Sequence, residues 1–275
     1  MLKKLLIVCV VLFVLWLGLV IFIRPSNERD WSTDQAVLPF GVMEENLIHL
    51  KNIRNFTYES STKYEPGYYD KTFDLNSITN VYFIMEPLSS FEGIAHTMLS
   101  FEFEGGNFIS ISVEIRKEKG ESFSPISGLF RQYEIMYVIA DERDIVKLRS
   151  NYRKDPVYLY PGKPSSHENL KKLFLSMIER ANELKDHPEF YNTLTNTCTT
   201  NIVSHINDIT AGRVPFSYKV LLPGYSDELA YKLGLIDTNL PFKKIREYYK
   251  INDQALKYAD SEDFSIKIRE RPKAP

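Results

Sequence analysis

Cysteine is scarce in this sequence, with only two among 275 residues. Cys9 lies in an apolar N-terminal run, which leaves Cys198 without a cysteine partner in the rest of the chain. A framework of intramolecular disulfides is therefore excluded. The sequence also lacks a CxxC pair, an HExxH motif and any paired-histidine spacing. We accordingly predict no metal site and no cofactor.

An excess of charge of one sign is also absent. The chain has 34 basic and 36 acidic residues, a formal net charge of −2, and no long block of like charge. Nucleic-acid-binding proteins usually carry a concentrated basic surface, so no nucleic-acid partner is predicted. The 44% of hydrophobic residues can build a sizeable core, and the length indicates one large domain with appendages.

A long apolar run opens the chain. It covers Leu5–Ile23, follows Lys3 and Lys4, and ends at Arg24. At about 1.5 Å per helical residue it nearly spans a hydrocarbon layer of about 30 Å, and no small-residue cleavage site follows it. We therefore predict a signal-anchor transmembrane helix over residues 1–25. The N-terminus would be cytoplasmic, the protein single-pass, and a lipid bilayer its partner.

The stretch LTNTCTTN surrounds Cys198 with hydroxyl and amide side chains. Apolar residues recur at helical spacing after it, which predicts a helix over about 198–208 capped by Asn196 or Thr197. Free N–H groups in a first helical turn lower a thiol pKa. Those of Cys198 and Thr199 could also bind an oxyanion. The alternative is a buried and unreactive cysteine.

A thiolate nucleophile needs a base, and His96 is the best-placed histidine. His205 lies about 10 Å along the predicted helix from Cys198, too far for a hydrogen bond. Exposed loops or helix ends are expected for the other three: His49, His167 and His187. His96 opens a strand pattern, so it can be held rigidly.

The strand of His96 belongs to a predicted hairpin. Two runs of alternating polarity, 95–103 and 107–116, flank Gly105-Gly106. A two-residue turn would mix apolar and polar faces, whereas a three-residue turn separates them and places Glu114 on the face of His96. In this register we expect Glu114 opposite Met98 and diagonal to His96. Glu114 could then orient the imidazole, or it could be a solvated residue paired with a basic side chain.

The order of the remaining patterns predicts an α+β fold with an antiparallel sheet packed with helices. Strands are expected at 80–87, 134–140 and 157–161, and helices at 166–185, 227–233 and 243–258. We predict a tether or lid over 26–77, a catalytic domain over 78–260 and a polar tail over 261–275. The acidic run DERD (141–144) is interpreted as a solvated helix cap.

Several segments resemble the Lnb-type N-terminal periplasmic domain family. They are HTMLSFEF, GLFRQYEIMYVIADERD, VYLYP, EFYNTLTNTCTTNIVSHIN and LLPGYSDELAYKLGLIDT, between about Val81 and Thr238. The resemblance implies a circularly permuted papain-like (NlpC-type) arrangement, with Cys198 as nucleophile and His96 as base. It also implies a periplasmic domain at a bacterial inner membrane, and acyl transfer through a thioester on lipoproteins or phospholipids.

Three functions remain open at this level. The first is a membrane-anchored cysteine acyltransferase or hydrolase, with Asn196 and Tyr133 as further candidate substrate-binding residues. The second is a papain-like peptidase or amidase that acts on cell-wall peptides. The third is a non-catalytic, membrane-tethered binding module in which Cys198 is merely buried.

Overall fold

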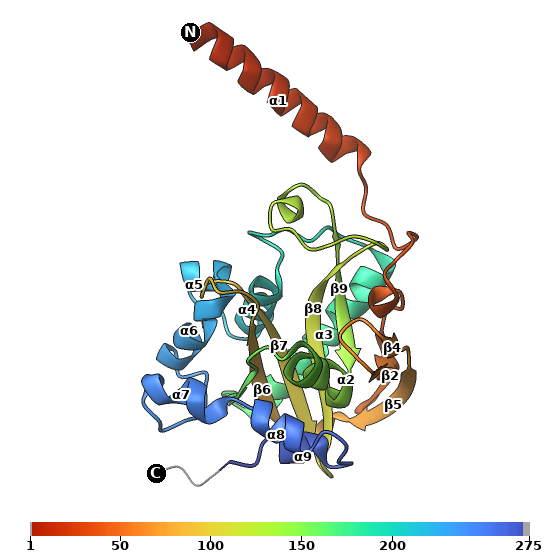
Figure 1. Ribbon diagram of the computed structural model, residues 1–275, viewed down its shortest axis with the longest axis vertical. Coiled ribbons are helices and arrows are strands. Elements are labelled where there is room, and N and C mark those ends of the chain that lie inside the picture. The colour runs from red at the N-terminus through yellow and green to blue at the C-terminus, as the bar shows by residue number, and fades with distance from the viewer. Residues whose placement is uncertain (1, 272–275) are drawn as a thin grey trace.

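The apolar N-terminal run forms a helix, α1 (Leu2–Phe22), that extends away from the rest of the molecule (Figure 1). The computed structural model describes residues 2–271, apart from a few side chains of α1, among them that of Cys9. Across these residues, no helix combines the length and apolarity needed to cross a membrane. The run is therefore helical as predicted, but the predicted transmembrane helix is not confirmed.

An eight-stranded sheet forms the centre of the domain. Seven strands follow the order β1-β2-β9-β8-β7-β6-β10, and β5 pairs with β2. Their bounds are β1 (Phe40–Glu44), β2 (Leu47–Arg54), β5 (Tyr68–Asp74), β6 (Ile78–Pro87), β7 (Ala95–Phe103), β8 (Asn107–Arg116), β9 (Glu134–Ala140) and β10 (Tyr158–Pro161). All pairings are antiparallel except the contact of β2 with β9. The short strands β3 (Thr57–Tyr58) and β4 (Tyr64–Glu65) pair separately.

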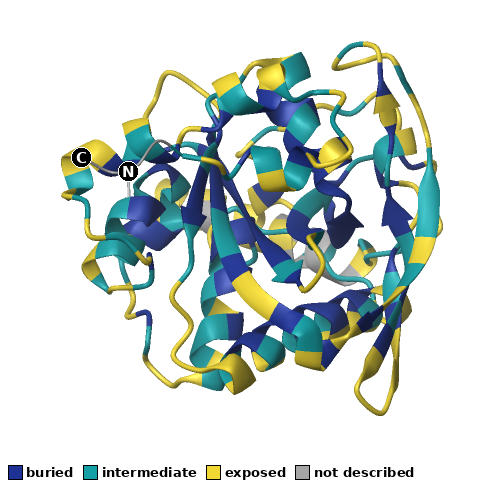
Figure 2. Ribbon diagram, turned by 90° about the horizontal axis from the view of Figure 1, so that it is seen from below, coloured by how far each residue is buried: buried dark blue, intermediate teal, exposed yellow. Residues whose placement is uncertain are grey.

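Helices cover both faces of the sheet, and the buried residues gather between these layers (Figures 1 and 2). On one face α3 (His167–Asp186) and α4 (Cys198–Ile209) pack against alternate residues of β7, such as Leu99 and Phe101. The opposite face carries α2 (Glu142–Lys147), the π-helical turn η4 (Leu148–Arg153), α8 (Asn252–Lys257) and α9 (Phe264–Lys267). Near the β10 edge lie α5 (Tyr218–Leu221), α6 (Ser226–Lys232) and α7 (Phe242–Tyr249). The predicted α+β class with helices on a mostly antiparallel sheet is confirmed.

Three predicted segments differ from the structure. Residues 40–74 of the expected tether or lid form strands, and Ile48, Leu50 and Ile53 are almost completely buried. The expected helix over 243–258 is two helices, because Ile251 N–H donates to the Val157 carbonyl between them. The expected polar tail contributes α9, whose Phe264 is fully buried; residues 272–275 of that tail lie outside the described residues.

The β7–β8 hairpin has the predicted three-residue connection. Phe103 pairs with Asn107, which leaves Glu104, Gly105 and Gly106 in the turn. Both glycines have φ near +70°, a backbone conformation that costs glycine little (Gly105 φ 75°, Gly106 φ 72°). The apolar and polar faces separate as predicted. The prediction that Glu114 pairs with Met98 is wrong. Ser112 pairs with Met98, so Glu114 lies two positions closer to His96 than expected.

The acidic run 141–144 caps α2 but is not solvated. The Asp141 side chain accepts a hydrogen bond from the Arg143 N–H, as a cap should. Glu142 and Asp144 are fully buried. Arg269 pairs with Glu142 and Arg54 pairs with Asp144, so each buried carboxylate has a counter-charge. Arg54 Nε and Nη2 each lie 2.9 Å from an Asp144 carboxylate oxygen. The sequence pattern predicted the cap of α2. The burial of Glu142 and Asp144 depends on two arginines that are distant in the sequence.

Replacing Arg54 with alanine is expected to destabilise the fold by about 3–5 kcal/mol, because the buried Asp144 carboxylate loses its counter-charge. Urea unfolding of the full chain measures the change. Lys63→Ala is the control, since its pair with Glu59 is exposed and is expected to contribute less than about 1 kcal/mol. Equal losses in the two variants would contradict the prediction.

Candidate active site

Cys198 lies at the start of α4, held there by a capping box. The Thr200 N–H donates to Thr197 Oγ1 (3.2 Å), and the Thr197 N–H donates to Thr200 Oγ1 (2.7 Å). Thr197 is thus the cap, one of the two residues predicted for it. The N–H groups of Cys198 and Thr199 occupy the first two helical positions, which have no acceptor within a helix. Both N–H groups can therefore face an anion beside the sulfur. Cys198 is buried, with 8% of its surface exposed.

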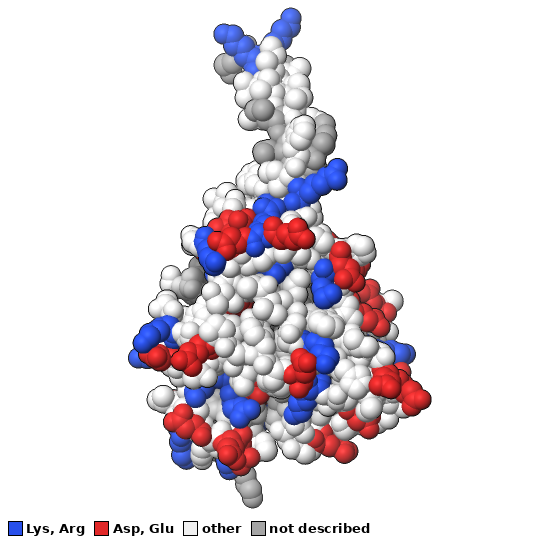
Figure 3. Space-filling model, turned by 90° about the vertical axis from the view of Figure 1, so that its right-hand side faces the viewer, with Lys and Arg blue, Asp and Glu red and all other residues white. Residues whose placement is uncertain are grey.

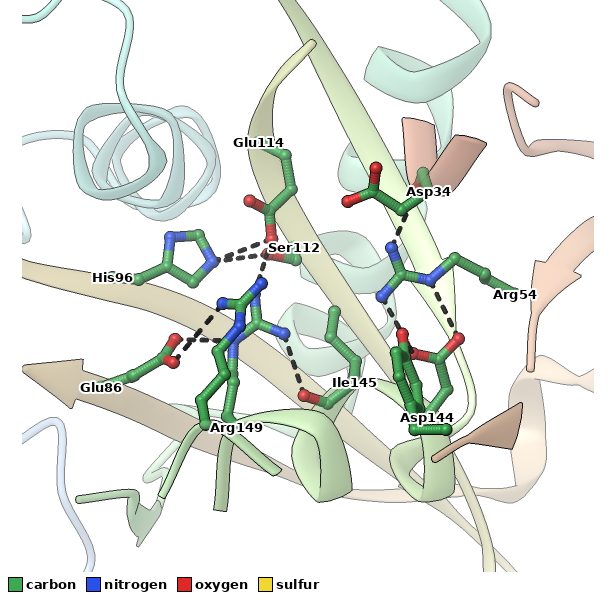
Figure 4. Close-up of polar contacts among 11 residues, drawn as sticks. Asp34, Arg54, Glu86, His96, Ser112, Glu114, Asp144, Ile145 and Arg149 are labelled. Carbon is green, nitrogen blue, oxygen red and sulfur yellow. Dashed lines mark hydrogen bonds and ion pairs between the residues drawn. The ribbon is translucent and has the colours of Figure 1, made fainter. Parts of the chain in front are cut away.

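His96 lies at the start of β7 and contacts two side chains of β8 (Figure 4). Its Nε2 is 2.7 Å from Ser112 Oγ and 3.2 Å from Glu114 Oε1. Ser112 in turn donates to the same Glu114 oxygen over 2.7 Å. Since Nε2 is engaged, Nδ1 is the ring nitrogen left to face Cys198, and the thiol and the imidazole are close enough to shift each other's pKa. The structure thus brings together Cys198, His96 and Glu114.

An arginine from the turn that packs on the same face of the sheet holds Glu114 in place (Figure 4). Arg149, in the π-helical turn η4, donates from Nη2 to Glu114 Oε1 over 2.8 Å. Its Nε donates to Glu86 Oε2 (2.7 Å) and its Nη1 to the Ile145 carbonyl (2.9 Å). Glu86 is the cross-strand neighbour of His96. Each of the three guanidinium nitrogens therefore donates a hydrogen bond, and Glu114 has little freedom to move.

Mutual charge sets the protonation of the thiol and the imidazole. Burial disfavours the imidazolium, but the charges of Glu114 and Cys198 outweigh it and raise the pKa of His96 to about 10. Burial likewise disfavours the thiolate, yet His96 and hydrogen bonds from Thr97 lower the pKa of Cys198 to about 7. Although burial opposes it, His96 and Arg149 hold the pKa of Glu114 well below its usual range. Near neutral pH the geometry favours a thiolate beside an imidazolium.

Cys198, His96 and Glu114 line a cavity of about 440 Å³. Its other walls include apolar side chains of the loops near its opening, among them Leu88, Phe91, Phe123 and Leu222. A cavity of this size can admit a small substrate or one end of a larger one.

A second cavity, of about 150 Å³, runs along α4. Its α4 wall consists of Thr199, Ile202, Val203, Ile206 and Ile209, and Val81, Phe83 and Leu99 of the sheet also line it. Thr199, the residue after Cys198, marks one end, where its Oγ1 lies 2.9 Å from Thr97 Oγ1. We call this cavity the α4 groove. It is almost entirely apolar, so it suits a hydrocarbon chain better than a polar one.

The structure does not place the two other predicted substrate-binding residues among those that line the cavity of Cys198. The Asn196 amide donates to the Phe190 carbonyl and accepts from Asn201. The Tyr133 hydroxyl donates to the Ser122 carbonyl (2.6 Å) and accepts from the Ser124 N–H (2.9 Å). Both residues shape loops beside the site. Their proposed contact with substrate stays a prediction.

The side chains of three of the other four histidines have partners that suggest a structural role. His205 is buried against Tyr137, with Nε2 2.7 Å from the hydroxyl, and burial lowers its pKa to about 4. His49 belongs to β2 and not to a loop, and it contacts Thr72 and Glu44. His167 bonds the Ile78 carbonyl at the start of α3, and His187 follows the end of α3, as expected.

Sequence reasoning missed three residues that shape the site: Thr97, Ser112 and Arg149. Ser112 could have been found, because the strand alternation already places it between His96 and Glu114. Thr97 points to the other face of the same strand, so alternation conceals its contact with Cys198. No local signal marks Arg149, since its contact with Glu114 depends on a turn that packs from 35 positions away.

Replacing Glu114 with glutamine should raise the pKa of Cys198, because the imidazolium that stabilises the thiolate loses its counter-charge. We expect alkylation by iodoacetamide at pH 7 to slow by about threefold to tenfold. The measurement is the alkylation rate as a function of pH, read by intact mass. Glu102→Gln is the matched control, because that carboxylate lies in the same hairpin and bonds Asn80 and Tyr82 instead. An unchanged pH midpoint for Glu114→Gln would contradict the assignment.

Fold and site together define an α+β protein that holds a buried thiol beside a histidine and a carboxylate. A sequence model of the Lnb N-terminal periplasmic domain matches residues 64–224, more than half of the chain. The chain belongs to the Lnb N-terminal periplasmic domain family, as its motifs indicated. The family name also gives the domain a periplasmic location. Neither the curated proteins nor the solved structures that were compared with the chain gave a match.

Proposed function

We propose that this protein is a thiol acyltransferase or hydrolase that works through a thioester at Cys198. The carrying observation is that Cys198, His96 and Glu114 line one cavity, where His96 Nε2 contacts both Ser112 and Glu114. Nucleophile, base and orienting acid are the three roles that such catalysis needs. The histidine strand precedes the cysteine helix in the chain, so we further propose a circularly permuted papain-like arrangement.

The proposed reaction has two steps. The Cys198 thiolate attacks the carbonyl carbon of an ester; the C–S bond forms, and the leaving alcohol takes the proton of the His96 imidazolium as its C–O bond breaks. An amine or water then attacks the thioester, gives its proton to His96, and releases the thiolate as the C–S bond breaks. The N–H groups of Cys198 and Thr199 are placed to stabilise the oxyanion in both steps.

The α4 groove favours an acyl donor over a peptide. It begins at the residue next to the nucleophile and follows a helix of 12 residues, about 18 Å long at 1.5 Å per residue. Its lining offers few partners for the polar groups of a peptide, whose burial without hydrogen bonds is costly. Helix α1 supports a bilayer as the source of such a donor, since its described leucine, valine and phenylalanine side chains are exposed.

The test is to trap the acyl-enzyme. The full chain is mixed with vesicles of phosphatidylethanolamine and phosphatidylglycerol, quenched in acid and measured by intact mass. We expect a mass increase of one acyl chain, located on Cys198 by peptide mapping and removed by neutral hydroxylamine. Acylation that persists after Cys198→Ala, or cleavage of cell-wall peptides without any acylation, would contradict the proposal.

Filling the α4 groove should change the preferred chain length. Val203→Trp is expected to slow thioester formation from a long-chain ester by about tenfold or more, while a short-chain ester reacts as before. The measurement compares acylation by butyryl and palmitoyl nitrophenyl esters. Val42→Trp, at an exposed position of β1, is the control and should leave both rates unchanged. A parallel loss for both esters would mean that Val203 does not contact the chain.

A further inference from the structure

Large apolar side chains stand exposed on the loops that contribute residues to the Cys198 cavity. They come from three loops, and each is between 44% and 69% exposed: Leu88, Phe91, Phe123, Ile126, Phe130 and Leu194. We call this set the apolar rim. Single exposed apolar residues are common, but a group of them around one cavity is typical of an interaction surface.

The loops of the rim form one surface. Thr193 Oγ1 donates to the Pro125 carbonyl over 2.7 Å, which joins the loop before α4 to the loop before β9. The Phe123 ring lies edge-on to Tyr191, with centroids 6.3 Å apart. Leu88, Phe91 and Phe123 all line the cavity of Cys198. Part of the apolar rim therefore lines the cavity that leads to the Cys198 thiol.

The apolar helix α1 leaves the domain beside this rim. The Ser26 N–H donates to Glu134 Oε1 (3.1 Å), and Arg29 pairs with the same oxygen (2.9 Å). Glu134 begins β9, immediately after the loop that carries Phe123, Ile126 and Phe130. Figure 1 shows α1 and this loop, with its short helix at Ser127–Leu129, at the same end of the molecule.

The charge distribution sets helix α1 apart from the domain. Figure 3 shows Lys and Arg at the two ends of α1, uncharged described atoms between them, and charges of both signs over the side of the domain. The described large apolar side chains of α1 are exposed, the least being Trp16 at 47% and the most Phe22 at 85%. An apolar helix and an apolar rim lie at the same end of the molecule. This arrangement suits a lipid bilayer, in which a hydrocarbon layer is flanked by polar head groups.

We propose that the apolar rim docks on the surface of a lipid bilayer, so that the cavity of Cys198 opens directly onto lipid. Docking itself depends only on the rim and α1; its use for substrate entry rests on the proposed function. Side chains such as Phe130 and Ile126 would enter the boundary between head groups and acyl chains, where amphipathic elements usually lie. An acyl donor could then reach the thiol without crossing water.

The experiment measures the depth of the rim in a membrane. Ile126→Trp is placed in the full chain and bound to vesicles of phosphatidylcholine and phosphatidylglycerol that contain brominated phosphatidylcholine, a quencher of tryptophan fluorescence. Leu256→Trp is the matched control, because Leu256 is also 69% exposed but belongs to α8, at the opposite end of the domain (Figure 1). The parent signal of the two native tryptophans is subtracted. We expect quenching at position 126 to exceed that at position 256 by about threefold or more.

Equal quenching at the two positions would overturn the proposal. So would a gain in particle mass with no quenching at position 126, which would indicate pairing with a second copy. Phe130→Trp repeats the measurement if Ile126→Trp does not fold. The Cys198→Ala background separates the two proposals, because docking must persist there. Quenching without acylation in the parent chain counts against the proposed function alone, and acylation without quenching counts against docking alone.

Discussion

Replacing Cys198 with alanine is expected to abolish acyl-enzyme formation and to lower kcat/KM for ester cleavage by about 10³-fold or more. The physical reason is that the sulfur is the atom that bonds to the acyl carbon, and neither Thr197 nor Thr199 can supply an equivalent anion at neutral pH. Ester cleavage is followed by release of free fatty acid or lysolipid from vesicles. Cys198→Ser should retain the packing but lose nearly the same activity, because a hydroxyl has no lowered pKa to match that of the thiol.

Two controls make this result specific. Cys9→Ala leaves Cys198 as the only thiol and should keep full activity. Thermal unfolding of Cys198→Ala should show a loss of about 1 kcal/mol, the usual cost of trimming one small buried side chain. If Cys198→Ala remains folded and still cleaves esters, the proposed chemistry is wrong.

The second large effect concerns His96. In the parent protein we expect the reaction rate to rise with pH through about 7, where Cys198 loses its proton, and to fall above about 10, where His96 does. Below the first value the nucleophile is a neutral thiol. Above the second, no acid remains to protonate the leaving group. The plateau between these values is the pH range of the thiolate and imidazolium pair.

His96→Gln removes the charge that lowers the pKa of Cys198, while the burial that raises this pKa remains. Alkylation by iodoacetamide at pH 7 should slow by about 30-fold, and its midpoint should move to higher pH. His49→Gln is the control, because His49 lies in β2 with Thr72 and Glu44 as partners. A parent-like pH profile for His96→Gln would show that another group, such as the Thr97 N–H, controls the thiol.

Local patterns were sufficient for much of the fold. Helix α4, its cap at Thr197 and the β9 strand follow from residue spacing, because each depends on neighbours within a turn or a strand. Which hairpin residues share a face also followed from polarity, since a slip of one residue would have moved Phe101 off the face that α3 and α4 cover. The expected opposite of Met98 was wrong because pairing Met98 with Glu114 requires a three-residue turn at 105–107, whereas the turn lies at 104–106.

The strands between residues 40 and 74 were missed for a different reason. Ile48, Leu50 and Phe73 alternate as strand residues do, but the segment is rich in polar residues and tyrosines, which is also typical of a linker. Only its pairing with β9, through Arg54 and Ala140, makes it part of the sheet. Pairing between segments so far apart cannot be deduced from either one.

The sequence by itself determined the class of fold, the family, and the thiol and histidine of the candidate site, because periodicity and motifs are local properties of a chain. The tertiary structure alone decided that Arg149 fixes Glu114, that Asp144 is buried against Arg54, and that the apolar rim and α1 share one end of the molecule. Charges and cavities of this kind depend on residues that meet only after folding. The positions of these charges and cavities depend on which face of the sheet each helix covers. Residue spacing in the sequence does not specify that choice.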